Sequence, residues 1–288
     1  MRIAHAPTQL ERQPRAVAIG TFDGVHRGHE SVVRAAIETG LAATVVTFDP
    51  HPRLALGNQV ELLATLERRL ELLEALGVES TLVVAFTREV MSLEPEAFAE
   101  GWLKPIGAEV VVAGEDFRFG RRRAGDLALL ERLGFRTIVA PEIEGISSSA
   151  IRAALHEGDV QAAARMLGRP PELDGVVVTG DQRGGTLGYP TANLLVEPNL
   201  LVPRFGIYAG ETLGHRAAIS IGTNPHYGGS ERRIEPHLLD FEGDLYGRRL
   251  VVELWRRLRD EAVFGTEQEL IDQIALDVAA TRAAVRPV

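Results

Sequence analysis

The chain has 288 residues, 45% hydrophobic and 25% charged, and its formal net charge of −9 argues against a nucleic-acid partner, for which a basic surface is expected. It contains no cysteine, which excludes disulfides and thiolate metal sites and predicts a cytoplasmic protein. No apolar run is long enough to cross a bilayer and no signal-peptide pattern is present, so we expect no membrane partner, while a homo-oligomer stays open.

The first element is an apolar run at 16–19, which enters a glycine-rich turn, Gly20–Glu30, and a helical pattern at 31–39 leaves it. A helix N-terminus offers free N–H groups and a positive dipole end, which suit a phosphate. His26 and His29 are three residues apart and fall on one side of the first turn. Imidazoles there can donate hydrogen bonds to a triphosphate as charge builds in a transition state. The structural alternative is a tight turn with two surface histidines.

Beyond this helix, strand-like and helix-like segments alternate to the middle of the chain. The strand at 42–48 is almost continuously apolar, as in a parallel sheet buried on both faces. Alternation of this kind predicts a doubly wound parallel sheet with helices on both faces. The further elements that we expect are strands at 81–86, 110–113 and 136–139 and helices at 66–76, 95–103 and 127–133.

Polar loops follow several of these strands at the point where each strand ends. They are Asp49–Pro52, Gly114–Gly120 and Ile146–Arg152. Ligands on doubly wound sheets bind outside the carboxyl ends of the strands, so these loops and the histidine turn are expected to converge. Ser147, Ser148 or Ser149 can instead cap the helix that follows. Arg152, one turn into that helix, could bind a phosphate bidentately.

The apolar period changes from helical to alternating around Leu167–Glu172, where prolines end a helix. We therefore expect two domains, at 1–168 and 172–288, whose activities separate at this junction. Short strands punctuated by Pro, Gly and Asn predict a small antiparallel barrel or sandwich, closed by a helix at 267–278 behind the capping box Thr266–Glu269. The expected strands are at 174–179, 207–213, 217–221, 234–241 and 250–258.

Two segments of the second half carry chemistry. Gly180–Gly188 is a glycine-rich loop of the sort that covers phosphates, and Tyr189–Leu194 places a threonine hydroxyl and an amide directly after it. In the strand at 234–241, Glu235, His237 and Leu239 fall on one face and Leu238 and Asp240 on the other. A turn at 190–193 and a surface Glu235 are the structural alternatives.

The motifs of the first half resemble a known family. Segments 20–29 and 146–152 resemble the H-x-G-H and I-S-S-T-x-I-R motifs of the nucleotidylyltransferase superfamily, with Ser149 where threonine is usual. Segments 47–52 and 114–120 resemble the FAD synthetase module of the bacterial bifunctional riboflavin kinase/FAD synthetases. The resemblance implies AMP transfer from ATP to FMN, with His26, His29 and Arg152 as catalytic residues. It also implies an ATP and phosphate site made of Gly20, Thr21, Phe22, Asp23, Gly28, Asp116, Ser147, Ser148 and Ser149.

The second half resembles the riboflavin kinase module of the same family. The shared motifs are a G-x-x-x-G-x-x-x-G-x-P-T-A-N stretch, H-L-L-D-F, D-L-Y-G and R-x-E-x-x-F. The resemblance implies that ATP phosphorylates riboflavin to FMN, that Thr191 binds Mg²⁺ and that Glu235 is the general base. The family thus uses ATP and Mg²⁺ at both sites, with riboflavin, FMN and FAD as its flavin ligands. It further implies ATP binding by Gly180, Arg183, Gly184, Gly188 and Asn193, and flavin binding by Arg259, Glu261 and Phe264.

The chain departs from the kinase pattern at Gly185, where the family has arginine, and at His226, where it has threonine. We expect Arg183 to substitute for the missing arginine. Two alternatives stay open. One is an FMN adenylyltransferase with a weakened or non-catalytic flavin-binding barrel. The other is a nucleotidylyltransferase acting on a different phosphorylated alcohol, such as phosphopantetheine.

Overall fold

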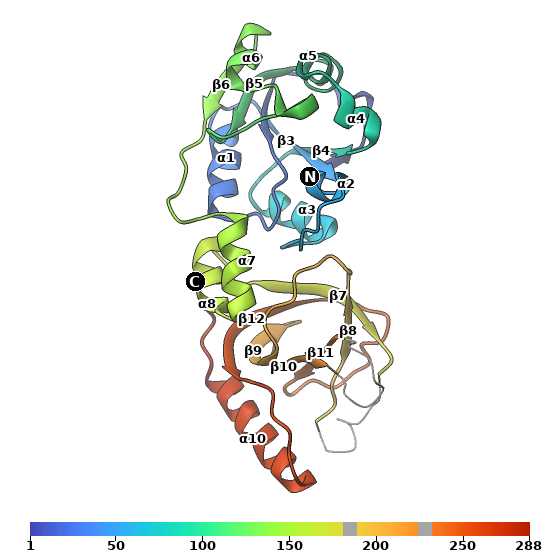
Figure 1. The fold of residues 1–288 in the computed structure, drawn as a ribbon, viewed down its shortest axis with the longest axis vertical. Coiled ribbons are helices and arrows are strands. Elements are labelled where there is room, and N and C mark those ends of the chain that lie inside the picture. The colour runs from blue at the N-terminus through green and yellow to red at the C-terminus, as the bar shows by residue number, and fades with distance from the viewer. Residues whose placement is uncertain (181–188, 224–231) are drawn as a thin grey trace. The chain divides into compact units, whose positions relative to one another are not determined.

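The chain forms two compact units in a computed structural model that describes residues 1–180, 189–223 and 232–288. The first unit consists of residues 1–60 and 66–146, and the second of residues 61–65 and 147–288. Figure 1 shows helices and strands of the first unit in blue to green and those of the second mainly in green to red.

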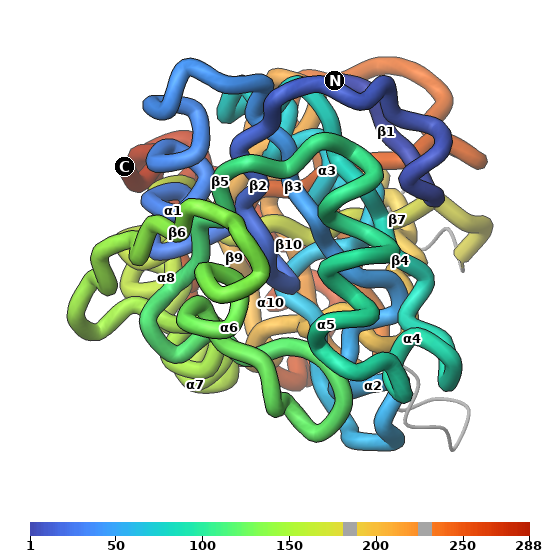
Figure 2. Tube along the Cα trace, turned by 90° about the horizontal axis from the view of Figure 1, so that it is seen from above, coloured from blue at the N-terminus to red at the C-terminus, as the bar shows by residue number. Residues whose placement is uncertain are grey.

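The first unit is built on one sheet of six parallel strands, in the order β1-β4-β3-β2-β5-β6. From β2 the chain moves outward to β3 and β4, and it then returns to the other side of β2 for β5 and β6, as Figure 2 shows. The strand order therefore reverses between β2 and β5, which is where such sheets bind ligands. The strands are β1 Arg2–Ala4, β2 Arg15–Ile19, β3 Ala42–Asp49, β4 Ser80–Ala85, β5 Ala108–Ala113 and β6 Arg136–Val139.

Both faces of this sheet are buried, because alternate residues of its strands enter two different cores. Ala16 and Ala18 of β2 pack in one core with residues of α1 (Arg27–Ile37) and α3 (Leu66–Ala75). Val17 and Ile19 pack in the other core, with residues of α5, of the π-helical turn that continues it, and of α6. This confirms the doubly wound fold predicted for the first half. The smaller elements are α2 Pro52–Ala55, α4 Arg88–Ser92, α5 Pro95–Phe98, the turn Ala99–Leu103, α6 Leu127–Arg132 and 3₁₀ turns at Pro7–Gln9 and Arg121–Arg123.

The second unit contains an antiparallel sheet of six strands, in the order β11-β10-β9-β12-β7-β8. The backbone N–H of Ala192, just before β8, donates to the carbonyl of Pro236 in β11 at 2.9 Å, so the two edges nearly close a barrel. This confirms the predicted barrel. The elements are β7 Glu172–Val178, β8 Asn193–Val196, β9 Gly206–Thr212, β10 His215–Thr223, β11 Arg232–Leu238, β12 Arg249–Arg259 and the closing helix α10 Glu267–Ala283.

Two helices before the barrel pack into its core. Ile151 and Leu155 of α7 (Ser148–Glu157) and Leu167 of α8 (Val160–Leu167) are buried in one cluster with Leu173 and Leu254. These helices therefore belong to the second compact unit, although they precede the predicted domain boundary at 168–172. The expected separation of the two activities at that boundary stays a prediction.

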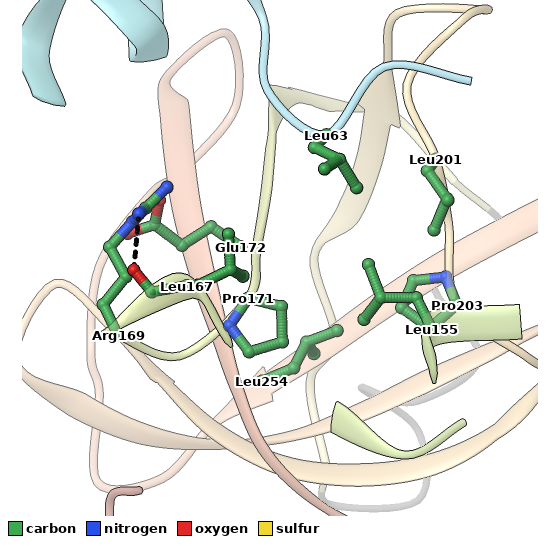
Figure 3. Close-up of a pocket in the computed structure, with 9 residues that line it drawn as sticks. All are labelled: Leu63, Leu155, Leu167, Arg169, Pro171, Glu172, Leu201, Pro203 and Leu254. Carbon is green, nitrogen blue, oxygen red and sulfur yellow. Dashed lines mark hydrogen bonds and ion pairs between the residues drawn. The ribbon is translucent and has the colours of Figure 1, made fainter. Parts of the chain in front are cut away.

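A short strap, residues 61–65, also belongs to the second unit. The N–H of Leu62 donates to the carbonyl of Asn199 at 2.7 Å, and the N–H of Leu201 donates to the carbonyl of Leu62 at 2.8 Å. Leu63 points into a small closed cavity of about 10 Å³ that is lined mainly by leucine and proline side chains, as Figure 3 shows. The cavity has room for about one water molecule, so the strap is closely packed.

We expect a fragment of residues 147–288 to be more stable to unfolding than a fragment of residues 172–288. The shorter fragment lacks Ile151, Leu155 and Leu167, which are buried in the barrel core. Each buried side chain of this size contributes about 1.5–3 kcal/mol. Urea unfolding followed by circular dichroism checks the difference, and equal midpoints for the two fragments would contradict it.

Candidate active sites

The turn after β2 is tightly wound and buried. Phe22 and Val25 have φ values of 51° and 40°, in the left-handed region that residues other than glycine rarely adopt. Phe22 is 1% exposed and Asp23 is 2% exposed, so the turn is packed into the unit. The backbone N–H of Gly20 donates to the carbonyl of Val46 at 3.1 Å, which continues the pairing of β2 with β3. Surrounding structure therefore fixes the turn in a conformation that costs energy by itself.

Helix α1 begins at Arg27, four residues before the start that the apolar period predicts. His26 is its N-cap, and the ring Nδ1 of His26 accepts a hydrogen bond from the backbone N–H of His29 at 3.2 Å. The rings of His26 and His29 are stacked with centroids 3.6 Å apart. The rings of Phe22 and His29 form an edge-to-face pair with centroids 5.3 Å apart. The structure therefore brings both histidines together at a helix N-terminus, with Gly28 between them in the first turn.

Asp116 lies at the carboxyl end of β5, on the other side of the point where the strand order reverses. It is exposed in a turn closed by the N–H of Phe117 and the carbonyl of Gly114, at 3.1 Å. Loops that follow β2 and β5 flank the ligand crevice of a doubly wound sheet. The position of Asp116 therefore fits the ligand role expected for it.

The serine loop lies in the second unit. Ser147 is the N-cap of α7, and its hydroxyl oxygen accepts from the N–H of Ala150 at 3.1 Å. Ser148 and Ser149 form the first turn of the helix. Arg152 donates from Nε to the carbonyl of Glu61 in the strap, at 2.6 Å. The capping alternative thus applies to Ser147, and the role of this loop toward a triphosphate stays a prediction.

A cavity of about 460 Å³ opens between the barrel and α10. Five residues predicted for the kinase site line it, together with five polar or aromatic residues that were not predicted for any site. The predicted five are Thr191, Glu235, Arg259, Glu261 and Phe264, and the further five are Tyr189, Ser220, Thr223, His237 and Asp277.

Strand β11 places Glu235 and His237 on the cavity side, while Ile234, Pro236 and Leu238 face the core. The ring Nδ1 of His237 lies 2.8 Å from the carbonyl oxygen of Pro190, which ties β11 to the segment that carries Thr191. Strand β11 ends at Leu238, three residues before the predicted end of this strand, and the prediction that Leu239 shares the face of Glu235 stays a prediction.

An ion pair between β12 and α10 also lines the cavity, and its carboxylate, Asp277, is buried while Arg259 is partly exposed. Arg259 donates from Nε and Nη2 to the carboxylate of Asp277, at 2.9 and 2.7 Å, and Gln273 donates to the same carboxylate at 3.0 Å. The guanidinium lies 5.9 Å from the centroid of the Phe264 ring. The wall therefore presents a cation of fixed orientation beside an aromatic ring.

Glu261 completes this wall. Burial raises the pKa of its carboxyl group, and the charge of Arg259 opposes that rise. Its carboxylate lies against Gly222 in β10, because a Cβ at that position would come within 1.7 Å of Oε1. Glycine at 222 is therefore needed for Glu261 to reach its place.

A second cavity, of about 170 Å³, is lined by Thr191, Asp244 and Tyr246 together with mainly apolar residues. Thr191 is thus common to both cavities. Asn193, two residues on, lies against Gly180, where a Cβ would come within 2.1 Å of the amide nitrogen. Of the other residues predicted for ATP binding in the kinase, Arg183, Gly184 and Gly188 lie outside the described residues, as do Gly185 and His226.

Comparison with known proteins identifies both halves of the chain. Residues 8–150 match the family model for FAD synthetase, and residues 167–285 match the model for riboflavin kinase. A bifunctional riboflavin kinase/FMN adenylyltransferase of Listeria monocytogenes is 38% identical in an alignment that covers 93% of this chain and 92% of that protein. The chain belongs to the bifunctional riboflavin kinase/FMN adenylyltransferase family. This confirms the predicted family and the order of its two domains.

Other members of this family are similar over the same length. The Bacillus subtilis protein of that name is 36% identical over 95% of this chain and 93% of its own length. A crystal structure described as a macrolide-efflux protein from Streptococcus pneumoniae is 31% identical, with a TM-score of 0.86 over 97% of this chain and 98% of that one. In residues 1–180, 189–223 and 232–288, no helix is both long enough and apolar enough to span a membrane.

Two residues that contact these sites were not predicted from the sequence: Asp277, which binds Arg259, and Arg69, which donates to the carbonyl of Thr21 in the histidine turn. Both occupy core-facing positions of a helix, where an apolar residue is the usual choice. Asp277 follows Leu270 and Ile274 at helical spacing, and Arg69 lies between Leu66 and Leu73. A charged residue at a core-facing position is the signal that could have found them.

We expect Asp277→Asn to raise the KM for riboflavin by about tenfold or more, because Arg259 loses a charged, bidentate partner. FAD synthesis from supplied FMN, carried out by the other unit, should stay within twofold. The matched control is Arg282→Gln on the same helix, which breaks the Arg282–Asp240 pair whose side chains are 53% and 68% exposed. Steady-state kinetics of both reactions check the prediction, and an unchanged riboflavin KM in Asp277→Asn would contradict it.

Proposed function

We propose that the second unit phosphorylates riboflavin with ATP and that the first unit transfers AMP from ATP to the FMN produced. Membership of the bifunctional family supports the pair of activities, and the match of residues 167–285 to riboflavin kinase supports their division between the units. The observation that carries the proposal is that Thr191 lines both cavities and that Glu235 lines the larger one.

In the kinase, riboflavin occupies the cavity of about 460 Å³, which is large enough for a tricyclic ring and lined by Arg259, Glu261 and Phe264. The nucleotide occupies the smaller cavity beside Asp244 and Tyr246. Because Thr191 lines both, the transferred phosphoryl group passes beside its hydroxyl. Glu235 accepts the proton of the primary alcohol of the ribityl chain as that oxygen attacks phosphorus.

The residues around Thr191 fit Mg²⁺. This ion takes oxygen ligands and is usually bound by one or two protein side chains together with substrate phosphates. Thr191 and Glu235 offer a hydroxyl and a carboxylate on the same cavity. Within the described ranges, no group of three or more His, Cys, Asp or Glu could bind a metal ion by itself. When bound, Mg²⁺ would offset negative charge on the phosphoryl group, and Thr191 is the residue that we expect to bind it.

In the adenylyltransferase, the N-terminus of α1 faces the triphosphate. His26 and His29 donate hydrogen bonds to the phosphates as pyrophosphate leaves, and the positive end of the helix dipole adds to the same field. The phosphate of FMN attacks the α-phosphorus in line, so no covalent enzyme intermediate is required. Asp116 lies in the same unit and adds an ATP ligand on this proposal, while the roles that the family resemblance implies for Arg152 and the three serines stay predictions.

The experiment is to incubate the purified chain with riboflavin, ATP and Mg²⁺ and to separate the flavins by chromatography. We expect FMN to appear first and FAD to follow, and chelation of Mg²⁺ to stop both steps. Supplied FMN should give FAD without a lag. FAD from FMN, but no FMN from riboflavin, would instead support an adenylyltransferase whose barrel only binds flavin. Neither product would contradict the proposed function.

A further inference from the structure

Arg69 is a buried cation beneath the proposed adenylyl-transfer site. It lies in α3, whose Leu73 packs against the sheet, and only 5% of the residue is exposed. Arginine is rarely buried to this degree unless its donors are used. The neighbouring Arg68, by contrast, is only partly buried and forms an ion pair with Glu71 at 2.7 Å.

The donors of Arg69 reach the turn after β2 and the end of the adjacent strand β3. Nη1 donates to the carbonyl of Thr21, in the turn after β2, at 2.7 Å. Nη2 donates to the carbonyl of Phe48 at 3.3 Å and lies 3.9 Å from the carboxylate of Asp49, the last residue of β3. One side chain therefore links the histidine turn to the end of the neighbouring strand.

The Thr21 carbonyl is the centre of this link. It also accepts a hydrogen bond from the hydroxyl of Thr47 in β3, at 3.1 Å. Two donors, Arg69 and Thr47, thus fix one peptide group of the turn. Phe22 follows immediately with a φ of 51°, a conformation that persists only where surrounding contacts enforce it.

Carboxylates of the turn and of β3 offset the charge of Arg69. Burial lowers the pKa of its guanidinium, and the carboxylates of Asp23 in the turn and Asp49 at the end of β3 oppose that change. Groups from the turn and from the end of β3 therefore accept the hydrogen bonds of this side chain or offset its charge.

We infer that Arg69 is a positioning residue for adenylyl transfer. It fixes the Thr21 peptide and thereby the turn that ends at His26. The side chains of His26 and His29 are thus held in one orientation relative to the triphosphate. This inference rests on the proposed role of His26 and His29 in the first unit. A misplacement of about 1 Å in such a site costs about 10²-fold in rate.

The test compares Arg69→Met and Arg69→Lys with the control Arg68→Met in the full chain. We expect Arg69→Met to lower kcat for FAD formation by about 10²-fold, with the KM for FMN within about threefold of its normal value. Arg69→Lys, which keeps the charge, should recover at least part of kcat. Riboflavin phosphorylation, measured in the same samples, should stay within twofold for all three variants, and thermal unfolding followed by circular dichroism reports whether the first unit is folded.

Thr47→Val provides a second test that leaves the buried charge in place. It removes the other donor to the Thr21 carbonyl, so it should also lower kcat for FAD formation, while Thr47→Ser should restore it. Normal FAD formation in Arg69→Met would overturn the inference. Loss of adenylyl transfer in a variant whose first unit unfolds below the assay temperature, with no recovery in Arg69→Lys, would also overturn it in favour of a purely structural role. Wild-type protein that makes no FAD would instead refute the proposed function.

Discussion

Replacing Glu235 by glutamine is expected to lower FMN formation by about two to four orders of magnitude. Glutamine keeps the size and hydrogen-bonding capacity of the side chain on β11 but cannot accept a proton from the ribityl alcohol. Because Glu235 lies in the second unit, FAD synthesis from supplied FMN should persist. The rates of the two reactions, measured separately with riboflavin and with FMN, check the result.

The matched control is Glu242→Gln, which removes an exposed carboxylate seven residues later in the chain. It should leave both activities unchanged. Circular dichroism has to show that Glu235→Gln is folded before its kinetics are interpreted. If the Glu235→Gln variant is folded and forms FMN at a rate within tenfold of wild type, Glu235 is not the general base.

The second large effect is expected from His26→Ala combined with His29→Ala, which should abolish FAD formation and leave riboflavin phosphorylation nearly unchanged. Loss of one donor of this type costs about two to three orders of magnitude in rate. The loss should appear in kcat more than in FMN binding, since the histidines act where pyrophosphate leaves. Initial rates with varied ATP and FMN provide the measurement.

His26 also caps α1, so its removal has a structural cost that must be separated from the catalytic one. Loss of an N-cap costs about 0.5–2 kcal/mol of stability. His26→Asn keeps a cap acceptor and removes the imidazole, and His5→Ala removes an exposed histidine of the same unit as a control. Near-normal adenylyl transfer in the double alanine variant would exclude the turn from the mechanism.

The four central strands of the first unit, β2 to β5, were predictable because they are mostly buried on both faces and contain apolar runs, whereas the short edge strand β1 was not predicted. All five residues of β2 are buried, for example. The start of α1 was not predictable from the apolar period, since histidine is outside the usual set of N-cap residues. Strand β8 was missed because it begins at Asn193, within a segment whose Pro, Thr and Asn favour a turn.

The packing of α7 and α8 shows a different limit. Their apolar faces are evident in the sequence, but an apolar face does not reveal which core will cover it. Leu155 and Leu167 are buried with residues of the barrel, and the partly buried Leu63, about ninety residues earlier in the chain than Leu155, packs against the same cluster. Arg69 and Asp277 were missed for a related reason. Their partners, the Thr21 carbonyl and Arg259, are distant in sequence, and only the fold brings them together.

The most direct test of the two-step account follows labelled phosphorus from ATP into the flavins. With ATP labelled at the γ-phosphate and riboflavin as acceptor, the kinase should place the label in FMN. With ATP labelled at the α-phosphate and unlabelled FMN, the adenylyltransferase should place it in FAD and release unlabelled pyrophosphate. Label from the γ-position in FMN and from the α-position in FAD is the result that the account predicts. Flavins that carry no label from either position would contradict it.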